Sequence, residues 1–151
     1  MVSNIADFER NYATYDVDLQ LKDCLAFDPD LVILAIGENV PVLGSEDAKA
    51  QFKTGVMNLL RVSMAKRHPL VVVRSSFWAD AAKDEILAQA CQEAGGIFVN
   101  AGPLGREAAN VARSERSFAH DGVASHPGDQ GMKTLAEAIV QAVKQRDASL
   151  R

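Results

Sequence analysis

A chain of 151 residues with 48% hydrophobic residues fits one globular domain with its own core, and we treat residues 1–151 as a single domain. The net charge of −4 arises from 16 Lys and Arg residues against 20 Asp and Glu residues. This balance provides no cationic face for phosphates, so no nucleic-acid partner is expected.

The longest uninterrupted apolar run, Leu31–Ile36, is too short to span a membrane, and residues 1–20 contain no segment of signal-peptide type. We therefore expect no membrane partner and a cytoplasmic location for the chain as given, with a signal encoded upstream left open. Cys24 and Cys91 lie far apart within apolar helical patterns, which predicts buried free thiols and no metal site. No cofactor is expected.

Three short apolar runs predict strands, at Leu31–Ile36, Leu70–Val73 and Gly96–Val99. Runs without polar alternation are typical of strands that are buried on both faces in a parallel sheet.

Four amphipathic segments predict helices whose apolar faces pack in the core, because their apolar residues recur at spacings of three and four. One of these helices follows a start signal at Ser45, and another ends at Gly95. The predicted core faces are Val17, Leu21, Cys24 and Leu25; Phe52, Val56, Leu59, Leu60 and Ser63; Ile86, Leu87, Ala90, Cys91 and Ala94; and Met132, Leu135, Ala136, Ile139, Val140 and Val143.

Strands that alternate with helices predict an α/β fold, a three-layer α/β/α sandwich with a mainly parallel sheet. Residues 100–125 depart from this pattern, since they are weakly periodic and contain Gly and Ser. We expect them to form a long loop at the carboxyl edge of the sheet, where α/β folds bind ligands.

Polar residues that could carry chemistry occur in three segments, Ile36–Asn39, Arg74–Trp78 and His126–Asp129, which we expect to meet on one edge of the sheet. The amide of Asn39 could stabilise a developing oxyanion or could satisfy its own turn. His126 precedes a proline and is predicted to be the N-cap of the last helix. There it could act as a general base or as a capping residue.

Two of these segments resemble conserved blocks of the SGNH (GDSL-like) hydrolase superfamily. The segment FDPDLVILAIGENV resembles the third block, whose Gly-x-Asn core falls on Gly37 and Asn39. The segment HDGVASHPGDQGMKTLAEAI resembles the fifth block, which places the catalytic His, here His126, before a proline and a helix. The phrases NIADFER, RSSFWAD and ARSER also resemble a bacterial branch of the family, so the resemblance covers nearly the whole chain.

The resemblance implies a flavodoxin-like fold and hydrolysis of a small-molecule ester, in related branches often an acetylated sugar or a short acyl ester. It assigns Gly37 and Asn39 to the oxyanion turn and His126 to the base. Val123 stands where the family usually has the acid, so Asp121 is the candidate, with a backbone carbonyl or water as the alternative. The candidates for the substrate pocket are Glu38, Arg74, Ser75, Trp78 and His120.

The family's nucleophilic serine, which follows its first strand in a Gly-Asp-Ser or Gly-Asn-Ser turn, has no counterpart here. The segment Met1–Ile5 resembles the second strand, so the first strand and its serine are missing. Two functions follow: an ester hydrolase domain that lacks its nucleophile, or a non-catalytic ligand-binding or assembly domain. The unpaired edge of Leu31–Ile36 predicts a homo-oligomer, or a shift of Met1–Ile5 into the gap.

Overall fold

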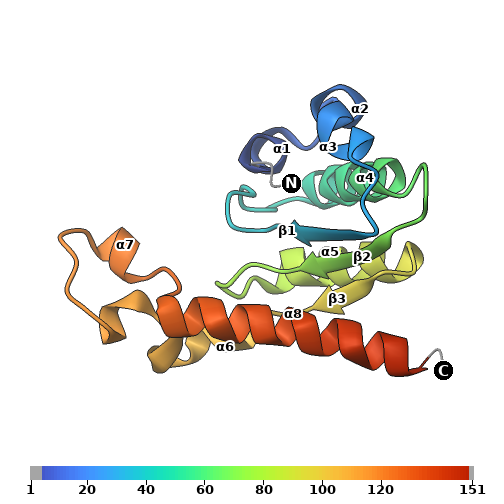
Figure 1. Cartoon of the computed structure of the whole chain (residues 1–151). Helices are drawn as coiled ribbons and strands as arrows, with labels where there is room; N and C mark the ends of the chain where they lie inside the picture. The colour runs from blue at the N-terminus through green and yellow to red at the C-terminus, as the bar shows by residue number, and fades with distance from the viewer. Residues whose placement is uncertain (1–4, 150–151) are drawn as a thin grey trace.

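The computed structural model describes residues 5–149 and shows a mixed α/β fold around a small parallel sheet (Figure 1). The strands lie in the order β1-β2-β3, and their register pairs Ile33 with Val72 and Val73 with Phe98. The three predicted strands are all present, as β1 (Leu31–Ala35), β2 (Leu70–Arg74) and β3 (Ile97–Val99). The predicted α/β class with parallel strands is confirmed.

Helical segments make up most of the rest of the described chain. They are α1 (Ala6–Asn11), α2 (Val17–Gln20), α3 (Lys22–Ala26), α4 (Glu46–Ser63), α5 (Ala81–Glu93), α6 (Gly102–Arg106), α7 (Asp121–Ala124) and α8 (Asp129–Ser149), with 3-10 turns η1 (Ala108–Asn110) and η2 (Ala112–Ser114). The region predicted as a long loop therefore consists largely of short helical turns.

The predicted start and stop signals act as expected in the two central helices. The Ser45 hydroxyl accepts the N–H of Ala48 at 3.1 Å and so caps α4. Helix α5 ends where Gly95 takes a φ of 71°, a conformation that glycine adopts at little cost. The first predicted helix is instead divided into α2 and α3, which meet at Leu21.

The main core lies on one face of the sheet. Val71 and Val73 belong to a buried cluster with residues of α4 and α5, while Val72, which is also buried, projects to the opposite face. Helix α8 contacts β2 and β3 and runs beside β3 in Figure 1.

Three residues of the predicted core face of α8 are exposed, namely Met132, Ala136 and Val140. Met132 is 59% exposed and Val140 is 52% exposed, so the prediction that the whole face is buried was wrong. On β1, Ile33 is likewise 48% exposed, whereas its neighbour Leu34 is buried. The reason is positional: α8 packs over β2 and β3, and β1 forms the edge of the described sheet with its outer side and one face uncovered.

Two further expectations concern the thiols and the start of the chain. Cys91 is buried as predicted, but Cys24 is only half-buried, and both are free thiols. The strand predicted at Met1–Ile5 lies, apart from Ile5, outside the described residues. Over the described part of the chain, no helix combines the length and apolar character needed to cross a membrane.

Candidate active site

Asn39 and His126 line the same groove at the carboxyl end of β1, although they lie on different segments of the chain. The polar wall of the groove contains Glu38, which follows β1, and Arg74, which is the last residue of β2. Its apolar wall comes from Trp78 and from one face of α8. The structure thus brings the predicted oxyanion donor and the predicted base to one site.

The turn after β1 depends on Gly37, whose φ of 127° is rarely accessible to residues with a side chain. The space beside Gly37 is also closed, because a Cβ added there would lie 3.0 Å from Cβ of Ser76 and 3.1 Å from its backbone nitrogen. This tight turn places Glu38 and Asn39 at the rim of the groove.

The Asn39 amide is held by a residue that the sequence reasoning missed. Its Nδ2 donates to Oε2 of Glu9 at 2.7 Å, and the N–H of Gly37 donates to Oε1 of the same carboxylate at 2.6 Å. Glu9 lies in α1 and is only 2% exposed. A single acidic residue in a short amphipathic segment gives little sign of burial, and only the tertiary contact between α1 and the turn after β1 reveals its role.

His126 is oriented by a backbone carbonyl. Its Nδ1 lies 2.6 Å from the oxygen of Gly122, and a carbonyl oxygen can only accept, so Nδ1 carries the proton. In the neutral ring Nε2 is then the acceptor nitrogen, which is the tautomer that a general base needs. The ring also meets Trp78 edge-on, with 4.9 Å between ring centroids and an interplanar angle of 89°.

Asp121 does not orient His126. It begins α7 as an exposed residue, and within residues 5–149 no hydrogen bond or ion pair joins it to His126. The Gly122 carbonyl takes that place because the chain after α7 folds back and brings the imidazole, four residues on, against the helix. The alternative of a backbone carbonyl as orienting partner is therefore the arrangement in the structure.

His126 is also not the N-cap of the last helix. Its backbone oxygen accepts the N–H of Ala112 at 2.8 Å, and Pro127 forms an antiparallel bridge with Val111. These contacts keep the chain extended at the proline, so α8 begins only at Asp129.

The start of α8 is capped instead by the side chain of Glu115. Its carboxylate accepts the N–H groups of Gln130 at 2.8 Å and Asp129 at 2.9 Å. These bonds, the one from Gln130 foremost, lower the pKa of Glu115 below its ordinary value.

Glu38 and Arg74 form an ion pair at 2.9 Å on the polar wall of the groove. A second guanidinium nitrogen of Arg74 donates to the backbone oxygen of Ser75 at 2.6 Å, and Glu38 accepts the N–H of Phe77 at 3.4 Å. The pair is largely buried and therefore fixes the shape of this wall.

The remaining predicted pocket residues lie outside the groove. Ser75 is fully buried, and its hydroxyl accepts the N–H of Ala101 at 3.0 Å, so it is not presented to a substrate. His120 is exposed and precedes α7. Among the described residues that line the groove, none carries a hydroxyl or a thiol.

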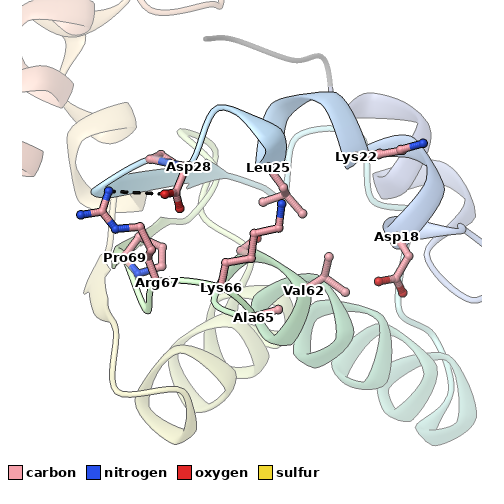
Figure 2. A pocket seen from close by; sticks show the side chains of 11 residues that line it. Asp18, Lys22, Leu25, Asp28, Val62, Ala65, Lys66, Arg67 and Pro69 are labelled. Atoms are coloured by element: carbon pink, nitrogen blue, oxygen red, sulfur yellow. Dashed lines mark hydrogen bonds and ion pairs between the residues drawn. The ribbon is translucent and has the colours of Figure 1, made fainter.

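Two other hollows involve β1 or the helices that precede it. One lies between α2–α3 and the end of α4. There, Figure 2 shows the Arg67–Asp28 ion pair at one end, 3.5 Å long, and Asp18 and Lys22 at the other. Its charges are mixed, and it contains no predicted site residue. The other runs along the free edge of β1 and shares Ala35 with the groove that Asn39 and His126 line.

Over residues 5–149, no group of three or more His, Cys, Asp or Glu side chains is arranged to hold a metal ion. Comparison with protein-family models, curated proteins and solved structures found no match to this chain.

Proposed function

We propose that this chain is most of an ester hydrolase domain of the SGNH type, which acts on small-molecule esters. The observation that carries the proposal is the groove that Asn39 and His126 both line, with the proton of His126 held on Nδ1 by the Gly122 carbonyl. Asn39 is bonded to Glu9 and His126 to Gly122, and an amide donor and a general base have complementary roles in acyl transfer.

In the proposed reaction, Nε2 of His126 takes a proton from an attacking hydroxyl while that oxygen bonds to the ester carbonyl carbon. The negative charge that develops on the carbonyl oxygen is stabilised by an N–H of Asn39. The Gly122 carbonyl accepts from Nδ1 and so favours the imidazolium that forms. General-base catalysis of this kind contributes roughly 10²–10⁴-fold in rate, and one oxyanion donor about 10²–10³-fold.

The hydroxyl would come from a strand that pairs with the free edge of β1 and completes a three-layer, flavodoxin-like sandwich. Two observations support this: the exposed apolar side chains Leu31 and Ile33 on the edge strand, and the groove along that edge, which joins the active site at Ala35. A strand lying parallel to β1 would end beside Asn39 and His126, since the carboxyl ends of parallel strands share one edge.

A second candidate is a non-catalytic ligand-binding or assembly domain, in which the uncovered face of β1 joins another copy in a homo-oligomer. The exposed apolar residues of β1 and α8 and the lack of a hydroxyl among the described groove residues favour it.

Hydrolysis of an aryl acetate separates the candidates. The chain as given should react no faster than its His126→Ala variant. The chain extended by the sequence encoded upstream should gain turnover that His126→Ala and Asn39→Ala abolish. His120→Ala is the matched control, because this exposed histidine lies outside the groove. No turnover in the extended chain would favour the assembly domain, and turnover lost in Ser75→Ala would assign the nucleophile to Ser75 and contradict the proposal.

A further inference from the structure

Glu9 is a buried carboxylate close to the active-site groove. It is 2% exposed, and within residues 5–149 it accepts hydrogen bonds from the Gly37 N–H and the Asn39 amide. A buried carboxylate depends strongly on such donors, because it cannot replace a lost partner with bulk water.

The two members of the Glu9–Asn39 bond differ in what they would lose if it broke. Asn39 is exposed and could exchange Glu9 for water at little cost. Glu9 would be left buried with the Gly37 N–H as its remaining donor. The burial of Glu9 therefore holds Asn39 in place, although Asn39 is at the surface.

We propose that Glu9 is a positioning residue, which fixes the rotamer and the amide orientation of Asn39 and presents its second N–H to the groove. A carboxylate only accepts, so Nδ2 and not Oδ1 must face it. The amide has two N–H groups, and the bond to Glu9 occupies one of them. This inference rests on the proposed function for the use of that second N–H, while the fixing of Asn39 is independent of it.

The test is the side-chain amide of Asn39, observed by proton–nitrogen NMR in the full chain. In the native protein its two N–H protons should differ in shift, and the one bonded to Glu9 should exchange slowly with water. Glu9→Gln offers one acceptor oxygen to two donors, so exchange should rise at least about tenfold. Glu115→Gln is the matched control: it also removes a carboxylate that accepts two N–H groups, but it does not contact Asn39. Equal exchange in the native protein and a folded Glu9→Gln variant would overturn the inference.

A double-mutant cycle keeps the test decisive if Glu9→Gln is poorly stable. Asn39→Ala should lower the folding equilibrium constant at least about tenfold more when residue 9 is Glu than when it is Gln. Equal effects in both backgrounds would refute the coupling. If the amide is fixed by Glu9 but the extended chain hydrolyses no ester, the proposed function fails and the positioning by Glu9 stands.

Discussion

The turn after β1 makes a quantitative prediction about Gly37. Replacing Gly37 with Ala forces a residue with a Cβ to adopt a φ of 127°. Strain of this kind costs about 1–3 kcal/mol. The new Cβ would also lie 3.0 Å from Cβ of Ser76, which is 3% exposed and whose hydroxyl accepts the N–H of Trp78. Crowding in a packed site adds about 1–3 kcal/mol. We therefore expect Gly37→Ala to lower the free energy of unfolding by about 2–6 kcal/mol.

Two other glycines separate strain from crowding. Gly95 has a φ of 71°, but a Cβ there would meet no atom within 4 Å, so Gly95→Ala should cost about 1–2 kcal/mol from strain alone. Gly44 lies outside the left-handed region, and a Cβ there would also meet open space. Gly44→Ala should therefore change stability by less than about 1 kcal/mol, in either direction.

Urea unfolding followed by circular dichroism measures all three variants, with the slope m as the check on two-state behaviour. The expected order of destabilisation is Gly37→Ala, then Gly95→Ala, then Gly44→Ala. A Gly37→Ala variant within about 1 kcal/mol of Gly44→Ala would show that this turn is neither strained nor closed, and the placement of Asn39 described above would be refuted.

Three further predictions concern other parts of the chain. Light scattering should show a species larger than a monomer, which Ile33→Lys shifts toward monomer. The control Leu19→Lys, at a side chain that is 64% exposed against 48% for Ile33, should cause no such shift, and a clean native monomer would contradict the prediction. Ser75→Ala should lower stability by about 1–3 kcal/mol, since it leaves the Ala101 N–H buried without its acceptor; exposed Thr54→Ala should cost under about 0.5 kcal/mol. The pKa of Glu115 is lowered in the folded protein, so its contribution to stability should be present above its ordinary pKa and lost as the pH falls through the folded value. The difference in stability between the native protein and Glu115→Gln should therefore disappear in acid. A difference that does not change with pH would contradict the capping role.

Much of the local structure could be predicted from the sequence, because local patterns determine it. Continuous apolar runs such as Leu70–Val73 are typical of strands buried in a parallel sheet. The capping role of Ser45 needs only its own hydroxyl and the backbone N–H of Ala48, three residues on. The position of Asn39 at the carboxyl end of β1 followed in the same way. His126 follows α7 and not a strand, so its place in the groove depends on how the segment between β3 and α8 packs.

The remaining features depend on contacts between segments far apart in the chain. Burial of Glu9 requires α1 to pack against the turn at Gly37, 28 residues away, and nothing in the sequence around Glu9 marks it as buried. Likewise α8 is capped by Glu115 and not, as predicted, by His126. The bridge between Val111 and Pro127 brings the Glu115 carboxylate to the start of the helix. A residue's spacing in sequence predicts the face it shares with its neighbours, but the partner that faces it is decided only when the whole chain packs.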